Sequence, residues 1–190
     1  MTETYILSTK VDQNGRRFVL TSRGQLVFGE ITPDTGLKAA PILLSEGIIT
    51  NQGTNDGYGL IHIEARHGEQ IRKAGYRSVI DFIEGVAKNY KTIRKGKRRN
   101  GAQTYMVQLV DTKNNTLIVE LSADGRFWNI NTAGVFRTTY GVKNNVVYNR
   151  PTSVKRPAET AGATRTEEQS STLSVPSRSN TPTQHHKDSK

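Results

Sequence analysis

The spacing of apolar residues divides the chain into a strand-rich start, a helical middle and a second strand-rich region. Three short β-rich runs, YILSTKV, RRFVLTS and QLVFGEI, lie between residues 5 and 32. The pair Asn14-Gly15 falls between the first two runs, and both residues tolerate the positive φ of a tight hairpin turn. The pattern predicts a small β-hairpin unit, which is too small to be stable unless it packs on the rest of the chain.

Residues 33–58 have the composition of a connection, because turn-forming residues surround one apolar patch, PILL. Two helices are expected to follow. The first covers about residues 58–73, and the second begins with Ser78 as its N-cap and Asp81 three positions later. Apolar residues then recur at steps of three and four, which predicts a core-facing stripe. They are Val79, Phe82, Ile83, Val86, Tyr90 and Ile93.

Four later runs, separated by the turn clusters at 111–115 and 123–125, predict strands. They are QTYMVQLV, TLIVELS, RFWNINTAGVF and, after a longer gap, NNVVYNR. Helices followed by a meander of strands are typical of an α+β fold. We therefore expect an α+β domain in which two helices pack on a four-stranded antiparallel sheet.

The C-terminal segment, 151–190, changes composition to Ser, Thr and Pro with almost no aliphatic residues. Such a segment cannot bury enough apolar surface to offset its ordering entropy, which predicts a disordered tail whose two adjacent histidines are solvated. The expected organisation is an N-terminal β-hairpin extension (1–32), one main domain (33–150) and this tail.

Charge adds a functional expectation to this pattern. The formal net charge is +10 over 190 residues, and residues 57–150 hold sixteen basic against seven acidic side chains. A cationic excess of this size indicates a polyanionic partner. No window resembles a membrane span or a signal peptide, so nucleic acid is favoured over an anionic membrane. Cysteine is absent, which excludes disulfides and Cys-based zinc sites and is compatible with a reducing cytosol.

A dense cationic run, KNYKTIRKGKRR, carries seven Lys and Arg residues in twelve positions. Its start is predicted to be helical and its end, after Gly96, to be a loop. Such a run can lie along a phosphate backbone, although a solvated, highly charged loop has the same composition. The candidate RNA-binding residues are Lys88, Lys91, Arg94, Lys95, Lys97, Arg98 and Arg99.

The stretch GLIHIEARHGEQI holds two of the four histidines within six positions. On a helix His62, Arg66 and Glu69 share one face, which offers an imidazole, a guanidinium and a carboxylate together. His67 lies about 140° around the helix from His62 and is expected to face the sheet. The same spacing fits two ordinary helix residues, His62 exposed and His67 satisfied in the core.

The run RFWNINTAGVF adds polar groups to a predicted strand. Strict alternation places Asn129 and Asn131 on one face and Trp128 and Thr132 on the other, with a bulge expected just after Thr132. The Thr132 hydroxyl and Arg137 could hold a phosphate between them, although Thr132 is also simply a good strand former. Trp128 is expected in the core rather than as a base-stacking platform.

Three segments taken in order resemble a known group of nucleases. PILLSEG, YGLIHIEARHGEQIRKAGYRSVIDFIEGVAKNYKTIRKG and IVELSADGRFWNINTAGVFR are similar to the barnase/colicin-type endoribonucleases found in phage polyvalent proteins and related mobile elements. These are grouped with the barnase, EndoU, colicin tRNase and RelE-like nuclease fold. The resemblance covers roughly residues 28–150. It implies helices packed on a four-stranded antiparallel sheet whose open face binds RNA, and cleavage that needs no metal or other cofactor.

In the implied reaction a base deprotonates the ribose 2′-hydroxyl, the oxygen attacks phosphorus, and an acid protonates the leaving 5′-oxygen. The product end is a 2′,3′-cyclic phosphate. Histidine suits both proton transfers, because its pKa lies near neutrality, and arginine suits the charge of the phosphorane. Glu64 is a further candidate for the base. The residues matched by the motifs, with Glu64, are His62, Glu64, Arg66, His67, Thr132 and Arg137.

The sequence therefore predicts an endoribonuclease acting in the cytoplasm of a bacterial host cell, with delivery by a phage particle as one route. RNA is the expected partner, with tRNA one candidate, and an immunity or inhibitor protein is a second candidate partner. The alternative is a non-catalytic nucleic-acid-binding protein of a phage or mobile element, which needs the basic run but no pair of proton-transfer groups. An acyl hydrolase or metalloenzyme is disfavoured, because the sequence has no nucleophile elbow, no Cys and no HExxH motif.

Overall fold

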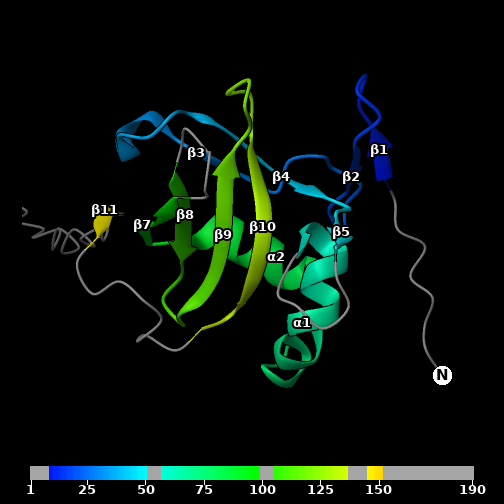
Figure 1. The fold of residues 1–190 in the computed structure, drawn as a ribbon. Helices are drawn as coiled ribbons and strands as arrows, with labels where there is room; N and C mark the ends of the chain where they lie inside the picture. The colour runs from blue at the N-terminus through cyan, green and yellow to red at the C-terminus, as the bar shows by residue number, and fades with distance from the viewer. Residues whose placement is uncertain (1–8, 51–56, 99–104, 137–144, 152–190) are drawn as a thin grey trace, which may run out of the picture. The chain divides into compact units, whose positions relative to one another are not determined.

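The computed structural model describes residues 9–50, 57–98, 105–136 and 145–151. For residues 97, 98 and 105 it describes the backbone alone. In these ranges the chain forms eleven strands, two α-helices and one 3-10 helix, η1 (Pro33–Thr35) (Figure 1). The predicted tail lies outside the described residues except for Pro151, so its disorder stays a prediction.

Nine of the strands form one mixed sheet in the order β1-β2-β4-β10-β9-β8-β7-β11, with β3 also paired to β4. In chain order they are β1 (Thr9–Val11), β2 (Arg17–Val19), β3 (Gly29–Ile31), β4 (Ala40–Ser45), β7 (Thr92–Arg98), β8 (Tyr105–Val110), β9 (Asn115–Leu121), β10 (Trp128–Val135) and β11 (Val146–Asn149). The two others, β5 (Ile48–Ile49) and β6 (Gly57–Tyr58), pair with each other. All described pairs are antiparallel except β4 with β10, where Ile42 lies opposite Trp128.

This architecture overturns the expected fold of two helices on a four-stranded antiparallel sheet. Strands β7 to β10 do follow one another as an antiparallel meander, but the sheet continues from β10 through β4 to the N-terminal strands. The sequence pattern assigned β4 to a connection, because PILL is short and turn-forming residues flank it. Ile42 and Leu44 are fully buried in the core, and this burial holds β4 in the sheet. The N-terminal hairpin is therefore one edge of the large sheet rather than a separate unit.

Helix α1 (Gly59–Lys73) begins where the chain passes close to the end of β4. A Cβ atom on Gly59 would lie 2.6 Å from the carbonyl oxygen of Ser45, and Gly59 has a φ of +78°, so both contact and conformation favour glycine here. The amide of Ile61 then donates to the Glu46 carbonyl at 3.0 Å. The start of α1 is thus fixed to the strand that the sequence pattern had not shown.

Helix α2 (Val79–Asn89) has the N-cap that its sequence predicts. The Ser78 hydroxyl accepts the amide of Asp81 at 3.0 Å, which satisfies one of the free donors of the first turn. The helix ends earlier than expected: Tyr90 is extended, and residues 92–98 form β7 rather than a helix end and a loop. Thr92 and Ile93 are β-branched and pair with both β8 and β11, which favours strand.

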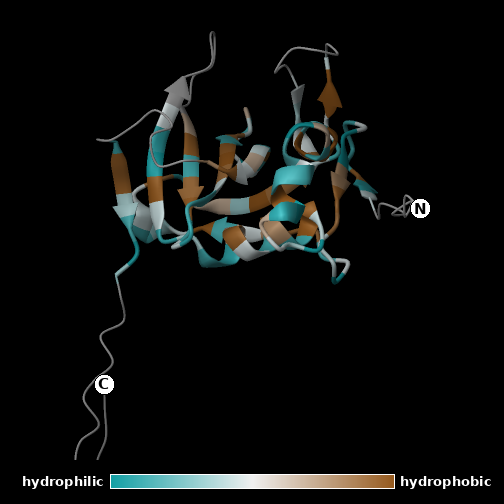
Figure 2. Cartoon of the chain, turned by 90° about the horizontal axis from the view of Figure 1, so that it is seen from below, coloured by the Kyte–Doolittle hydropathy of each residue, from teal (hydrophilic) through white to brown (hydrophobic). Residues whose placement is uncertain are grey.

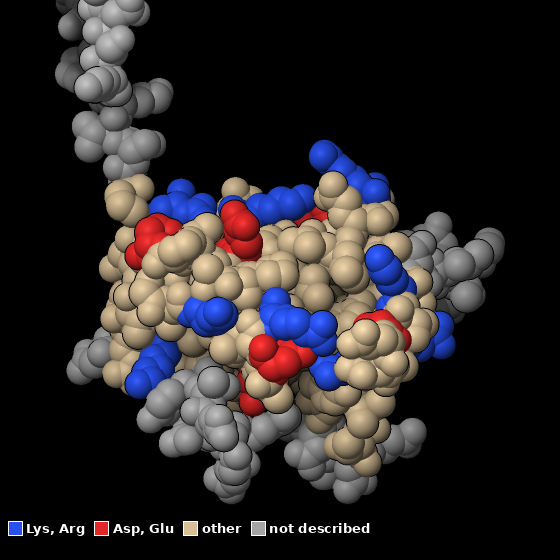
Figure 3. All heavy atoms as spheres, turned by 90° about the horizontal axis from the view of Figure 1, so that it is seen from above, with Lys and Arg blue, Asp and Glu red and all other residues tan. Residues whose placement is uncertain are grey.

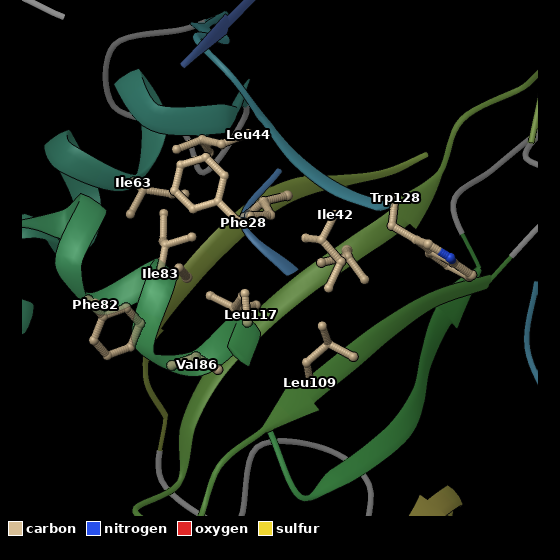
Figure 4. Close-up of a cluster of buried hydrophobic side chains, with 14 of the residues drawn as sticks. Phe28, Ile42, Leu44, Ile63, Phe82, Ile83, Val86, Leu109, Leu117 and Trp128 are labelled. Carbon is tan, nitrogen blue, oxygen red and sulfur yellow. The ribbon is translucent and has the colours of Figure 1, made fainter. Parts of the chain in front are cut away.

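One face of the sheet carries the main hydrophobic core, where α2 and the apolar side of α1 pack (Figures 1 and 2). Leu109 and Leu117 of the strands lie on the side of the sheet that carries Val86 of α2, and Trp128 extends the same core beyond Ile42 (Figure 4). The predicted stripe of the second helix and the core position of Trp128 are both confirmed. The indole NH of Trp128 donates to the Lys38 carbonyl at 2.9 Å, which satisfies its buried donor. The opposite face of the sheet is called the open face below.

Candidate functional site

A bulge in β10 decides which face carries Thr132. Ile130 lies opposite Val119 of β9, but the register then shifts, and Thr132 lies opposite Ile118. The extra residue at the shift is Asn131, so the bulge comes before Thr132 rather than after it as expected. Ile130 belongs to the core, whereas Thr132 lies on the open face instead of sharing the face of Trp128 as strict alternation predicted.

His67 faces β10 from the neighbouring helix α1, which confirms the expected direction of this side chain. A Cβ atom on Gly134 would lie 3.4 Å from Cγ of His67, so the absence of a side chain at Gly134 leaves room for the imidazole ring. The ring also packs edge-to-face on Phe136, with centroids 5.4 Å apart. Gly134 is two positions after Thr132, so both residues present the same face of β10 to this region.

His62 lies beside His67 and is buried, with 5% of its surface exposed. The two ring centroids are 6.2 Å apart, with the ring planes inclined by 70°. A Cβ atom on Gly57 of β6 would lie 3.0 Å from Nδ1 of His62. The expectation of an exposed His62 is therefore wrong, because β6, a two-residue strand that was not predicted, covers this side of α1. Within the described part of the chain, Nδ1 has no hydrogen-bond partner.

The surroundings of both imidazoles favour the neutral form. Burial lowers the pKa of His62 below its ordinary value, and the positive charge of Arg66 lowers it further. Burial also lowers the pKa of His67, with added contributions from His62 and Arg66. The three residues thus form one electrostatic group at the N-terminal half of α1. A bound phosphate would oppose this effect, because a negative charge favours the imidazolium form.

The other candidates on α1 point elsewhere. Glu64 is exposed and pairs with Arg72 at 2.9 Å. Glu69, which was expected to share a face with His62, pairs with Lys73 at 2.6 Å. The structure therefore groups the two histidines with Arg66, whereas both carboxylates are engaged in ion pairs with other residues of α1.

Of the two strand candidates, only Thr132 can be placed. Its hydroxyl oxygen is buried and has no hydrogen-bond partner among the described residues, which is uncommon for a buried polar atom. Arg137 lies outside the described residues. The convergence of the histidines with Thr132 is supported by the shared face of Gly134, while convergence with Arg137 stays a prediction.

The candidate RNA-binding residues are spread over the end of α2 and strand β7. Lys88 pairs with Glu84 at 3.7 Å, Lys91 is exposed, and Lys95 is half-buried. The side chains of Lys97 and Arg98 are not described, and Arg99 lies outside the described residues. On the face seen from above, Lys and Arg side chains lie in separate groups, several of them beside Asp or Glu (Figure 3).

Arg94 differs from the other basic residues because it belongs to the open face. The pairing of neighbouring strands places four residues in one row across β7, β8, β9 and β10. In order they are Arg94, Gln108, Ile118 and Thr132. Nε of Arg94 is buried without a hydrogen-bond partner, as is the Thr132 hydroxyl at the other end of the row. The open face thus carries two unpaired buried polar groups in register.

Sequence reasoning missed a chain of polar side chains on the same face. The Ser45 hydroxyl contacts Asn129, whose amide donates to Asn131 at 2.9 Å, and Asn131 donates to Glu120 at 2.8 Å. The alternation that put both asparagines on one face was a usable signal. Ser45 and Glu120 gave no signal, because their proximity depends on the pairing of β4 and β9 with β10.

Neither a metal site nor a known relative helps to define the site. Among the residues that the structure describes, no group of three or more His, Cys, Asp or Glu side chains is placed to hold a metal ion. No described helix combines the length and the apolar composition needed to cross a membrane.

Comparison with protein-family models, with curated proteins and with solved structures found no match.

Proposed function

We propose that this protein is a metal-independent endoribonuclease that cleaves RNA through a 2′,3′-cyclic phosphate. The observation that carries the proposal is the pair of imidazoles, His62 and His67, with ring centroids 6.2 Å apart and the Arg66 guanidinium near both. Two imidazoles and one permanent cation are the groups that proton transfer around a phosphate requires. The resemblance of the HIEARH and NTAGVFR segments to phage-encoded endoribonucleases supports the same class.

The roles follow from proton balance. One imidazole, in its neutral form, takes the 2′-hydroxyl proton as the 2′-oxygen attacks phosphorus. The other, in its charged form, gives a proton to the 5′-oxygen as the bond from phosphorus to that oxygen breaks. Arg66 stabilises the added negative charge of the phosphorane, and the Thr132 hydroxyl is free to donate to a phosphate oxygen. RNA, with tRNA as one candidate, would be cleaved in a bacterial cytoplasm, and an inhibitor protein would protect the producing cell.

The experiment incubates purified protein with total RNA and with tRNA in EDTA and identifies the fragment ends. We expect cyclic-phosphate ends, and a loss of turnover of about 10²-fold or more in the His62→Ala and His67→Ala variants. Because the pKa values of both histidines are lowered from 6.5, kcat/KM should follow a bell-shaped pH profile with its maximum below pH 6.5. Glu69→Gln is the matched control on the same helix and should cleave like the wild type.

Melting curves of each variant separate a catalytic loss from unfolding. If both histidine variants fold and cleave at the wild-type rate, the proposed site is wrong. If the wild type cuts no RNA in EDTA, the proposed activity is wrong.

A second candidate function is RNA binding without cleavage. It is favoured by the lowered pKa of both histidines, because the acid role needs a charged imidazole that neither residue readily supplies in the free protein. RNA that is bound but left intact at every pH below 6.5 would select this second function.

A further inference from the structure

The open face carries an apolar pocket at the end of the sheet formed by β1, β2 and β4. The pocket has a volume of about 340 Å³. Its floor is formed by Phe18, Leu43 and Phe127, which make a small buried cluster separate from the main core. Phe18 and Phe127 meet edge-to-face with centroids 5.3 Å apart. Apolar concavities with a few polar groups at the edge are typical of sites for small ligands or ligand moieties.

The rim of the pocket is cationic. Lys10 lies directly opposite Phe18 in the β1–β2 ladder, so both side chains project from the same face. Arg126 lines the pocket beside Phe127, and the Arg16 guanidinium lies 5.7 Å from the centroid of the Phe127 ring. Asp12 also lines the pocket. The rim therefore favours a ligand that joins a planar apolar part to an anionic part.

Acidic neighbours do not cancel this charge. Arg16 has Asp12 at 3.9 Å, and Arg126 has Asp124 at 2.6 Å. Lys10 makes no ion pair with any described residue, so three cations face two carboxylates. One positive charge is left at the mouth of an aromatic pocket.

The pocket is connected to the candidate catalytic region along the same face. The polar chain starts at Ser45, which lies opposite Phe18, and continues through Asn129 to the bulge at Asn131, next to Thr132. From Phe127 to Thr132 is five positions, which is about 16 Å along a strand. A short single strand of RNA can span this distance, and the amides between its two ends can both donate and accept hydrogen bonds.

We propose that this pocket binds one base of an RNA strand that extends to the histidines, with the attached phosphate held by Lys10 and Arg126. The inference rests on the proposed function, because that function supplies RNA as the ligand. Sequence-specific RNA recognition commonly splays single-stranded bases into aromatic or apolar sites while cations hold the backbone. The amides between the pocket and Thr132 favour a nucleotide chain over an apolar peptide side chain.

The test uses 2′-O-methyl RNA oligonucleotides, which bind but cannot be cleaved because they lack the attacking hydroxyl. A series in which each oligonucleotide lacks one base is titrated against the wild type by fluorescence anisotropy. We expect one position at which removal of the base weakens binding about tenfold, within the range of base–aromatic contacts. Leu26→Trp, which fills the pocket, should bind the intact oligonucleotide about as weakly as the wild type binds the one lacking that base.

A rim variant, Lys10→Ser with Arg126→Ser, changes two exposed side chains and breaks only the exposed Arg126–Asp124 ion pair, which contributes little to stability, so the fold is preserved. It should raise Kd and reduce the slope of log Kd against log salt by roughly 0.7, the value for one phosphate contact on a single strand. Lys113→Ser, an exposed lysine in the β8–β9 turn, is the matched control and should bind as the wild type does.

Three results would overturn the inference: no position-dependent effect in the wild type, a position-dependent effect that survives in Leu26→Trp, or unchanged RNA affinity in both pocket variants. The last of these would assign the pocket to a ligand other than RNA. Because the oligonucleotides cannot be cut, the outcome does not depend on catalysis. A protein that reads one base in this pocket yet cleaves no RNA would reject the proposed activity alone.

Discussion

The two faces of the large sheet differ in whether their buried side chains have packing or hydrogen-bond partners. On the helix-covered face Leu117, Val119 and Ile130 are fully buried against apolar neighbours. The open face carries polar groups, and two of them, Nε of Arg94 on β7 and the Thr132 hydroxyl on β10, are buried without a hydrogen-bond partner. A closely packed apolar face stabilises the fold, whereas unpaired buried polar atoms cost stability. The open face therefore holds groups that a bound molecule would satisfy.

The largest difference between the faces should appear when neighbouring residues of β9 are truncated. Leu117→Ala removes a fully buried side chain of the core and should lower the free energy of unfolding by about 2–5 kcal/mol. Ile118→Ala, on the half-exposed open face, should cost less than about 1.5 kcal/mol, because little of its contact area is enclosed. Urea unfolding of both variants measures the difference. Equal losses would show that the two faces are packed alike.

Removing one unpaired polar atom should separate stability from activity. Thr132→Val keeps the shape of the side chain and deletes a buried hydroxyl that has no hydrogen-bond partner, so it should raise the free energy of unfolding by about 1 kcal/mol. The same variant should cleave RNA more slowly, because it lacks the proposed phosphate donor. Urea unfolding and single-turnover cleavage are measured on the same sample. A destabilised variant would mean that the hydroxyl is satisfied in the folded protein.

The smallest expected effect is the pH dependence that the histidines give to folding. Their pKa values lie below 6.5 in the folded protein, so between the folded and the ordinary value the unfolded chain binds more protons. Stability should therefore be highest above pH 6.5 and fall as the pH drops through the folded pKa values. Urea midpoints measured across this range should change less in a His62→Gln, His67→Gln double variant. An unchanged slope would show that other groups cause it.

Local signals predicted those parts of the molecule that depend on nearby residues. Ser78 caps its helix as its spacing indicates, Trp128 is in the core, and His67 faces the sheet. The helix capped by Ser78 is nevertheless shorter than predicted. Its apolar stripe continues without a break into β7, so the sequence pattern does not show where the helix ends.

Features that depend on distant residues were missed. The place of β4 beside β10 is set by a pairing between residues 42 and 128, for which a single sequence gives no signal. The burial of His62 depends on β6, which is two residues long. The bulge at Asn131 shifts Thr132 to the open face, whereas the sequence predicted the bulge just after Thr132.

The parallel pairing of β4 with β10 has a consequence for the order of folding. Ile42 and its partner Trp128 are separated by both helices and five strands, so closing this contact carries the loop-closure cost of a long chain segment. The hairpins from β7 to β10 need only local closure and can form first. During synthesis the N-terminal strands leave the ribosome long before their partner exists. Until β10 is made, the aromatic pocket has no Phe127, so a ligand for that pocket can bind only to the completed sheet.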